Sequence, residues 1–367
     1  MNKIKLPNFG FKILQIESTA ACNMECSFCP YPLKEDKISK LSLEKIKNII
    51  DQIDPLDKQF KYVTFSQYNE PLLDSRVFEI MKYAQNSGLK VHLITNGLLL
   101  NKEKNIENIF LYKPTVKISL QVLDSTKHMG ARGLKLELDR YVNTIINFCI
   151  KAKNESIDVT VDIGSNYLSK SKYYLKSFFG LATGDPSVPN DIKTTILQFK
   201  KYMNLFYEAS DEKYKENLKV LLDEKNAKKI FSQNYLYQEG FKIFKNVTLK
   251  IKPFFYGRRI SDYEPRDNKF SCSSEILAVL ADGNVVPCCL AYDDSISLGK
   301  IKDGNLNEIL RENKFLKNLR NINGEKHLTC KKCFGEPTKR GLFFKKFLNL
   351  LPNYVLNSRL MQFVKEN

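Results

Sequence analysis

The chain has 367 residues, of which 43% are hydrophobic and 27% charged. This balance is typical of a folded globular protein and excludes a disordered or membrane-embedded chain. A prior of roughly 150 residues per domain predicts two or three domains, although one large barrel could take up most of the length. The 58 Lys and Arg exceed the 41 Asp and Glu and give a formal charge of +17, enough to attract polyanions or acidic membranes. The lysines are scattered and no nucleic-acid-binding motif occurs, so we expect no nucleic-acid partner.

The chain contains nine cysteines. No segment approaches the length of a transmembrane helix, and residues 1–10 lack the features of a signal peptide. We therefore expect a cytoplasmic protein. In a reducing cytosol, clustered cysteines bind metal or take part in catalysis more often than they form disulfides.

Short strands alternate with helices along the first half of the chain. Runs rich in β-branched and aromatic residues predict six strands: Ile13–Ile16, Tyr62–Phe65, Val91–Thr95, Val116–Leu120, Val159–Ile163 and Val247–Ile251. Apolar residues spaced by three and four predict amphipathic helices over 43–53, 77–84 and 134–148. Ser42 suits the N-cap of the first helix, and Gly88 suits the end of the second. This order predicts an α/β fold, a parallel sheet curled into a partial (β/α)6 barrel of the TIM type.

The alternation stops between the fifth and sixth strands, where helical spacing over 192–206 and 214–221 predicts a helical insertion. We divide the chain into a core barrel at 1–262 with this insertion at about 181–245, a cysteine-rich module at 263–337, and a tail at 338–367. The tail is both basic and apolar. It suits either an amphipathic helix with weak contact to a membrane surface or a helix docked on the barrel.

The first cysteine group follows the first expected strand. Cys22, Cys26 and Cys29 form a C-x3-C-x2-C motif. Three thiolates on one loop can hold three irons of a cubane cluster and leave the fourth iron open to another molecule. A zinc site would need a fourth protein ligand, and no other His or Cys lies close in sequence. An iron–sulfur site is favoured, with zinc or free thiols as the alternatives.

Residues 19–32, TAACNMECSFCPYP, resemble the signature of the radical S-adenosylmethionine (SAM) superfamily. In that family the methionine part of SAM chelates the open iron of a 4Fe–4S cluster. The resemblance covers about 11–255 and continues at successive strand ends, where barrel active sites gather. SQYNEPLLD at 66–74 stands where the family has Gly-Gly-Glu-Pro, with Tyr68 and Asn69 replacing the glycines, and TNG follows at 95–97.

The resemblance implies a SAM site at these strand ends. Glu70 would accept hydrogen bonds from the SAM ammonium. Asn69 would support the same turn, and Ser119 and Gln121 end the fourth strand, where a polar residue often touches the SAM ribose or carboxylate. The implied cofactor-binding residues are Phe28, Asn69, Glu70, Thr95, Asn96, Ser119, Gln121 and Arg132.

The second cysteine group lies in the C-terminal module. Its candidate ligands are Cys272, Cys288, Cys330 and Cys333, of which the last two have the spacing of a metal clasp. Asp282 and Gly283 predict a hairpin turn whose second strand leads to Cys288. Residues 272–333 resemble the SPASM/twitch extension of radical SAM enzymes, whose G-x4-C pattern favours Cys288 over Cys289. Four ligands imply one protein-ligated auxiliary 4Fe–4S cluster, with a zinc ribbon as the alternative.

The resemblance implies a radical SAM oxidoreductase. Reductive cleavage of SAM would yield a 5′-deoxyadenosyl radical that abstracts hydrogen from the substrate, and electrons would come from a flavodoxin- or ferredoxin-type reductant. One auxiliary cluster favours a two-electron oxidation of a small, sugar-like or other polar molecule. Arg258 and Arg259 are candidates for clamping an anionic substrate.

Two other functions remain open. The first is peptide modification, although the early start of the first strand predicts no appended leader-binding domain. The second is a non-catalytic iron–sulfur electron carrier, which would need no SAM site.

Overall fold

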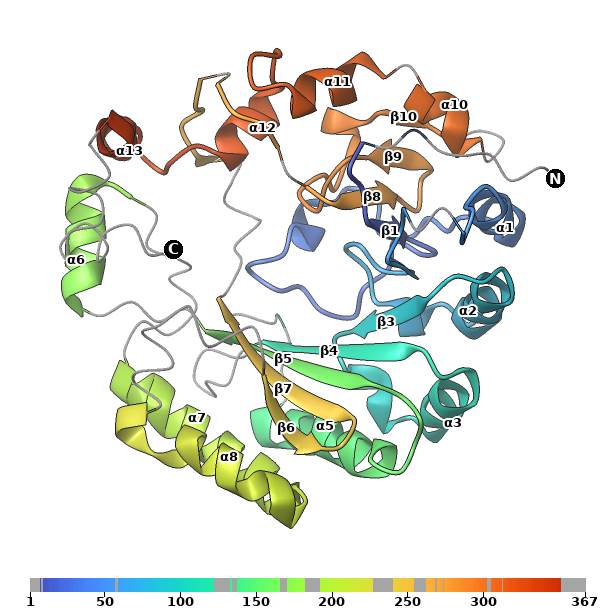
Figure 1. The fold of residues 1–367 in the computed structure, drawn as a ribbon, viewed down its shortest axis with the longest axis vertical. Coiled ribbons are helices and arrows are strands. Elements are labelled where there is room, and N and C mark those ends of the chain that lie inside the picture. Colours follow the sequence, from blue (N-terminus) through green and yellow to red (C-terminus); the bar gives the residue numbers. More distant parts are fainter. Residues whose placement is uncertain are drawn as a thin grey trace.

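The computed structural model describes residues 7, 9–56, 59–121, 133, 137–165, 170–181, 192–226, 240–253, 262–267, 269–272, 274–301, 305–311 and 313–350. Its strands form a ten-stranded sheet in the order β10-β9-β8-β1-β2-β3-β4-β5-β7-β6 (Figure 1). The sheet curls without closing, with β6 and β10 at its edges.

Six neighbouring parallel strands form the barrel and confirm the six predicted strands and the predicted fold class. They are β1 (Ile13–Ile16), β2 (Tyr62–Thr64), β3 (Val91–Thr95), β4 (Thr115–Gln121), β5 (Val159–Ser165) and β7 (Val247–Pro253). Because neighbouring strands are parallel, their carboxyl ends lie at the same edge of the sheet.

Helices cover the outer face of this sheet (Figure 1). They are α1 (Leu43–Asp51), α2 (Val77–Asn86), α3 (Glu103–Tyr112) and α5 (Leu138–Ala152). The Ser42 hydroxyl accepts a hydrogen bond from the Lys45 N–H at 3.2 Å, which confirms the predicted N-cap of α1. Gly88 has a φ of +84° just after α2, a conformation that favours glycine. The helix α3 was not predicted; it buries Ile106 and Ile109.

Between β5 and β7, the described part of the chain contains the helices α6 (Lys170–Phe179), α7 (Ile192–Ala209) and α8 (Glu212–Leu222). The second and third of these helices occupy the stretch predicted to be a helical insertion. A short strand, β6 (Phe241–Phe244), then pairs antiparallel with β7. Sequence analysis missed β6 because its four residues lie inside the stretch assigned to helices.

The cysteine-rich module continues the barrel sheet instead of standing apart from it. Its first strand, β8 (Ile276–Val279), pairs in parallel with β1 along the whole of both strands, from Ile13 opposite Ile276 to Ile16 opposite Val279. β8 forms a hairpin with β9 (Asn284–Val286), and Gly283 in the turn has a φ of +92°, which confirms the predicted hairpin. The remaining elements are β10 (Gly299–Lys300), α10 (Leu306–Arg311), α11 (Lys314–Arg320) and α12 (Leu328–Cys333).

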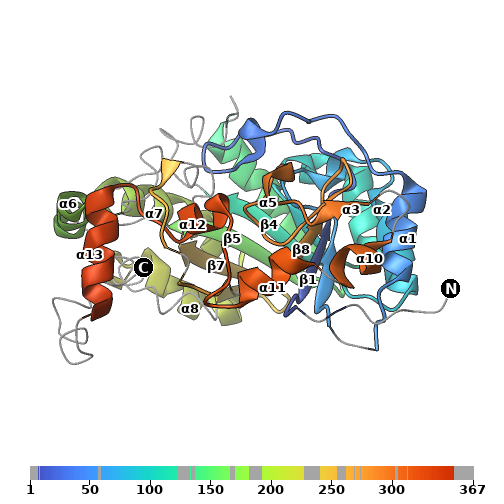
Figure 2. The same cartoon turned by 90° about the horizontal axis from the view of Figure 1, so that it is seen from above.

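The tail forms α13 (Lys339–Leu350), which docks beside α6 (Figures 1 and 2). The rings of Phe344 and Phe179 stack with centroids 3.8 Å apart. Lys345 pairs with Glu336 at 2.6 Å and Lys346 with Asp267 at 3.3 Å. This part of the tail therefore takes the docked arrangement, with both lysines engaged inside the chain. None of the described helices is long and apolar enough to cross a membrane.

Candidate functional site

The first three cysteines lie on the loop between β1 and α1, at the carboxyl end of β1. The buried Tyr31 side chain connects the two ends of their motif. Its hydroxyl accepts from the Cys22 N–H at 3.0 Å and donates to the Cys22 carbonyl at 3.3 Å, while its own N–H donates to the Cys29 sulfur at 3.4 Å. Sequence analysis did not assign a role to Tyr31, although it lies within the signature segment.

Burial raises the pKa of the Cys22 thiol to about 12, and the nearby Glu70, Cys26 and Cys29 act in the same direction. Negative charge is therefore disfavoured at Cys22. Bound iron would supply the positive charge that thiolates need there. Within the described ranges, no three His, Cys, Asp or Glu side chains surround a point that could hold a single metal ion. A cubane cluster places each thiolate on a different iron, and three thiols on one loop are the donors that three of its irons need.

Glu70 joins the ends of β2 and β3 and is 1% exposed. Its Oε1 accepts from the Thr95 hydroxyl at 2.8 Å and from the Leu72 N–H at 3.1 Å. Its Oε2 accepts from the Asn96 N–H at 2.8 Å. The Glu70 N–H donates to the Ala21 carbonyl, which attaches this network to the cysteine loop. Three of the residues implied by the resemblance thus form one hydrogen-bonded group beside the cysteines.

Two asparagines complete this edge. The side-chain Oδ1 of Asn69 accepts from the Gln67 N–H at 2.9 Å and its Nδ2 donates to the Phe65 carbonyl at 3.1 Å, so Asn69 closes the turn that it was expected to support. The side-chain Nδ2 of Asn96 donates to the side-chain Oδ1 of Asn23 at 2.7 Å, which links the end of β3 to the residue after Cys22. Sequence analysis missed Asn23.

The glycine at position 133 lies against the same loop. It has a φ of +68°, and a Cβ there would lie 2.7 Å from the Glu25 carbonyl oxygen, so only glycine fits without a shift. Ser119 lies opposite Asp162 in the pairing of β4 and β5, and Asp162 pairs with Lys117 at 3.3 Å.

The other implied residues are less informative. Phe28 is half-buried and packs against the core. The backbone of Gln121 ends β4, but its side chain lies outside the described part, as do Arg132, Arg258 and Arg259.

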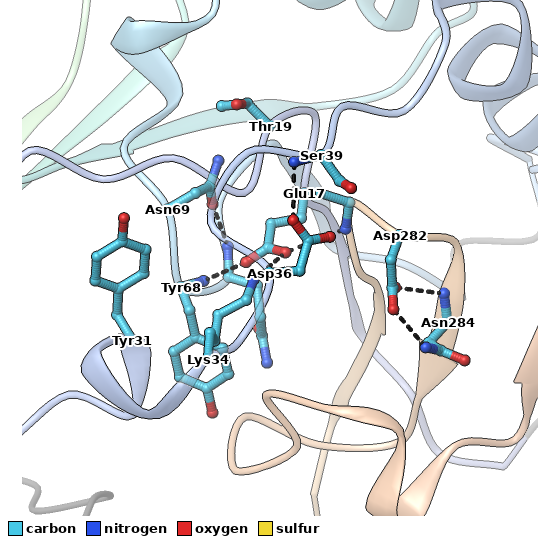
Figure 3. A network of polar contacts seen from close by, with 12 residues as sticks. Glu17, Thr19, Tyr31, Lys34, Asp36, Ser39, Tyr68, Asn69, Asp282 and Asn284 are labelled. Carbon is cyan, nitrogen blue, oxygen red and sulfur yellow. Dashed lines mark hydrogen bonds and ion pairs between the residues drawn. The ribbon is translucent and has the colours of Figure 1, made fainter.

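A buried ion pair connects the cysteine loop to the C-terminal module (Figure 3). Glu17, directly after β1, is 0% exposed, and its Oε2 lies 2.7 Å from the Nζ of Lys34. The same oxygen accepts from the Ala281 N–H at 3.1 Å, and Oε1 accepts from the Tyr68 N–H at 3.0 Å. Glu17 thus joins four segments: the end of β1, the cysteine loop, the turn after β2 and the β8–β9 hairpin. Sequence analysis missed it.

The second cysteine group lines a cavity of about 400 Å³ with mostly apolar walls. Five cysteines contribute to it: Cys272, Cys288, Cys289, Cys330 and Cys333. They come from the segment before β8, the segment after β9 and α12. The structure therefore brings together the four predicted ligands and adds Cys289, which sequence analysis had set aside.

Burial raises the pKa of Cys330 to about 11 and that of Cys333 to about 12. After burial, the charge of Cys272 raises the pKa of Cys330 most. The charges of Cys272, Cys330 and Cys289 likewise raise the pKa of Cys333. The pKa of Cys288 is raised by burial and by the charges of Cys289 and Cys330. The cavity thus has the donor set and the mostly apolar walls that suit a cluster held by protein thiolates.

Comparison with known proteins identifies two regions of similarity. Residues 16–164 match the radical SAM superfamily, and residues 272–334 match the SPASM iron–sulfur cluster-binding domain. The AdoMet-dependent heme synthase of Methanosarcina barkeri is 24% identical over 214 residues, which are 55% of this chain and 59% of that protein. The PqqA peptide cyclase of Bradyrhizobium diazoefficiens is 24% identical over 186 residues, 45% of this chain and 48% of that protein. The matches therefore span about half of these relatives.

Solved structures with a similar fold include SuiB of Streptococcus suis and BtrN in complex with AdoMet and 2-DOIA. SuiB is 14% identical with a TM-score of 0.48, and the match covers 85% of this chain and 68% of that one. BtrN is also 14% identical with a TM-score of 0.44, and the match covers 86% of this chain and 88% of that one.

Proposed function

Because the chain belongs to the radical SAM superfamily and carries a SPASM domain, we propose that it catalyses a two-electron oxidation of a small polar substrate, such as a sugar-like alcohol. A radical SAM domain uses a 4Fe–4S cluster and SAM, and a SPASM domain carries auxiliary iron–sulfur. When bound, these groups supply one-electron cleavage of SAM, abstraction of a hydrogen atom from the substrate and a second one-electron acceptor.

Each cofactor is assigned to one cysteine group. Cys22, Cys26 and Cys29 would hold the SAM-binding cluster. Four of the five cysteines around the second cavity would hold one auxiliary 4Fe–4S cluster. The support for both assignments is the donor chemistry: three partly or fully buried thiols on one loop, and a mostly apolar cavity lined by cysteines.

The strand-end network would orient SAM beside the first cluster. Glu70 is already fixed by Thr95, Leu72 and Asn96, so its carboxylate would receive the SAM ammonium without having to reorganise. The buried positions of Glu70 and Thr95 would help to keep water from this edge. Arg258 or Arg259 remains our proposal for a clamp on an anionic group.

The proximity of the two cysteine groups is the observation that carries the oxidation. β1 leads into the first group and pairs edge to edge with β8, which precedes the hairpin of the second. The turn after β2 reaches both: the Glu70 N–H donates to Ala21 beside Cys22, and the Gln67 amide donates to the Cys288 carbonyl at 3.2 Å. A substrate between the groups would lose a hydrogen atom on the side of the first group, where SAM is cleaved, and its second electron to the auxiliary cluster on the other side.

Peptide modification is the second candidate, and the similarity to PqqA peptide cyclase favours it. The two functions differ in the substrate from which the hydrogen atom is abstracted. Assays with polar alcohols and with peptides, each scored by mass change and by 5′-deoxyadenosine formed per product, would separate them. A loss of two mass units in an alcohol supports our proposal, and a modified peptide with no reaction of alcohols replaces it.

Anaerobic reconstitution with iron and sulfide counting tests the cofactor assignment. The wild type should bind about eight irons, and the triple Ala variant of Cys22, Cys26 and Cys29 about four. A double Ala variant of Cys330 and Cys333 is the matched control; it should also retain about four irons, but on the first site. Dithionite replaces the expected flavodoxin- or ferredoxin-type reductant. SAM cleavage that survives in the triple variant, or is absent from the iron-loaded wild type, would disprove the assignment.

A further inference from the structure

Arg320, the last residue of α11, holds one wall of the cavity that the second cysteine group lines. Its Nη1 donates to the carbonyl of Cys272 and its Nη2 to the carbonyl of Ser274. The backbone adds a third contact, because the Cys272 N–H donates to the Leu319 carbonyl at 3.1 Å. Cys272, Ser274 and Leu319 all line the cavity. The guanidinium therefore lies beside the segment that carries the predicted ligand Cys272.

An aromatic ring from the barrel also holds the guanidinium. The Cζ of Arg320 lies 5.2 Å from the centroid of the Phe11 ring, which is 1% exposed and precedes β1. The Ser271 hydroxyl donates to the Arg320 carbonyl at 2.8 Å, so the backbone of this residue is held as well. Two carbonyls and a ring thus restrict the planar guanidinium to one position beside the cavity.

The positive charge of Arg320 has no counter-charge among the described residues. The partly buried side chain makes no ion pair with an Asp or Glu there, and its Nε is buried without a hydrogen-bond partner. Such charges are normally paired, because their removal from water is costly. Glu275, an acidic residue of the cavity wall, is already paired with Lys12. The negative charge of a thiolate-ligated cluster in the cavity would supply the missing counter-charge.

We propose that Arg320 is a positioning residue for the auxiliary cluster: it holds the Cys272 segment and, through its permanent charge, raises the reduction potential of that cluster. This inference rests on the auxiliary cluster proposed above. The reduced cluster carries more negative charge than the oxidised one, so a nearby cation stabilises the reduced form more. The mostly apolar walls screen this attraction less than water would. A higher potential makes the auxiliary cluster a better acceptor for the second electron of the substrate.

Redox titrations of the reconstituted holoproteins, monitored by electron paramagnetic resonance, test the charge. Arg320→Gln removes the charge but keeps an amide donor, so the midpoint potential of the auxiliary cluster should fall while that of the SAM-binding cluster stays unchanged. Arg320→Lys keeps the charge and should retain most of the wild-type potential. Lys317→Gln is the matched control, because it removes an exposed charge three residues earlier on the same helix; both potentials should remain those of the wild type. An unchanged auxiliary potential in Arg320→Gln, or an equal fall in Arg320→Lys or Lys317→Gln, overturns the inference.

Iron counting on the same samples decides the case in which Arg320→Gln binds no auxiliary iron. Loading restored by Arg320→Lys, with the potential of the wild type, supports the inference, because lysine supplies the charge without the two-pronged contact. An Arg320→Lys protein that loads with a clearly lower potential, or does not load, overturns the role of the charge. The two proposals fail separately: a wild type whose C-terminal cysteines bind no iron disproves the auxiliary cluster, whereas loaded clusters with unchanged potentials disprove only the role of Arg320.

Discussion

The two cysteine groups are built in opposite ways. The first places three cysteines on one loop and surrounds them with polar strand ends, where Glu70, Thr95 and Asn96 share hydrogen bonds. The second collects five cysteines from distant segments around one cavity with mostly apolar walls. Three thiolates among polar groups suit a cluster that binds another molecule, whereas a mostly apolar cavity with a full set of thiolates suits a cluster closed to ligands. The comparison predicts that one group serves chemistry on SAM and the other electron transfer.

The largest expected effect separates these two roles. Cys26→Ala removes a ligand from a set of three, so we expect complete loss of 5′-deoxyadenosine formation and of about four irons. Cys330→Ala should also remove about four irons but leave SAM cleavage in place. Iron content and product formation, measured on the same reconstituted samples, check both outcomes. If Cys330→Ala abolished SAM cleavage while the first cluster stayed intact, the division of roles would be wrong.

The choice between Cys288 and Cys289 sharpens the comparison. The G-x4-C pattern predicts Cys288, but Cys289 lines the same cavity and is the one that influences Cys333. We keep Cys288 as the predicted ligand, so Cys288→Ala should lose the auxiliary cluster and Cys289→Ala should retain it. Iron counting in the background of the first-loop triple Ala variant reads the auxiliary site alone. Iron retained in Cys288→Ala and lost in Cys289→Ala would reverse the assignment.

Glu17 holds the two regions together, and breaking its ion pair should weaken both. Glu17→Gln leaves Lys34 buried without its partner, which typically costs about 3–5 kcal/mol of unfolding free energy. The double variant Glu17→Gln/Lys34→Met should recover part of that loss. Denaturant unfolding of the apoprotein measures it. Lys151→Met is the control, because the exposed pair of Lys151 with Glu103 should contribute at most about 1 kcal/mol. Equal effects of Glu17→Gln and Lys151→Met would contradict the central position of Glu17.

Much of the fold could be predicted from the sequence because its signals are local. The six barrel strands are β-branched runs, and the Ser42 cap and the Gly283 turn depend on neighbouring residues. The first cysteine loop was recognisable for the same reason. Glu17 could not be interpreted, since its partners Lys34, Tyr68 and Ala281 come from three segments that only the folded chain brings together.

The pairing of β8 with β1 was equally hidden from the sequence. An interval of more than half the chain separates the two strands, and their hydrophobic patterns do not specify a partner. The fifth cavity cysteine, Cys289, was set aside because the G-x4-C spacing selects only Cys288. In the folded chain both neighbouring cysteines line the cavity.

A smaller effect is expected where Glu70 organises the first region. Glu70→Gln replaces one acceptor oxygen with an amide donor facing the Thr95 hydroxyl or the Asn96 N–H, and should cost about 1–3 kcal/mol of stability. If Glu70 also receives the SAM ammonium, SAM affinity should fall about tenfold or more. Equilibrium binding of SAM to the reconstituted protein measures it. Thr95→Val is the control that removes the Thr95 hydroxyl, with its hydrogen bonds to Glu70 and from the Gly97 N–H, and keeps the carboxylate. Equal SAM affinities in both variants would limit Glu70 to a structural role.

The smallest effect concerns acid stability and belongs to the first region alone. Arg76 forms a two-pronged ion pair with the buried Asp74 and donates to the carbonyls of Ser18 and Leu41, which flank the cysteine loop. Burial by itself would raise the pKa of Asp74, but the hydrogen bonds and charge of Arg76 outweigh it and hold the pKa below its usual value.

A depressed pKa in the folded state stabilises the protein fully above the pKa of the unfolded carboxyl, about 3.9, and this contribution is lost as the pH falls through the folded value. Arg76→Gln should therefore lower the unfolding free energy of the apoprotein at neutral pH and flatten its decline below about pH 4. Urea unfolding at a series of pH values measures both. A variant whose stability declines in acid as steeply as that of the wild type would show that the Asp74–Arg76 pair is not what ties the flanks of the first loop to the barrel.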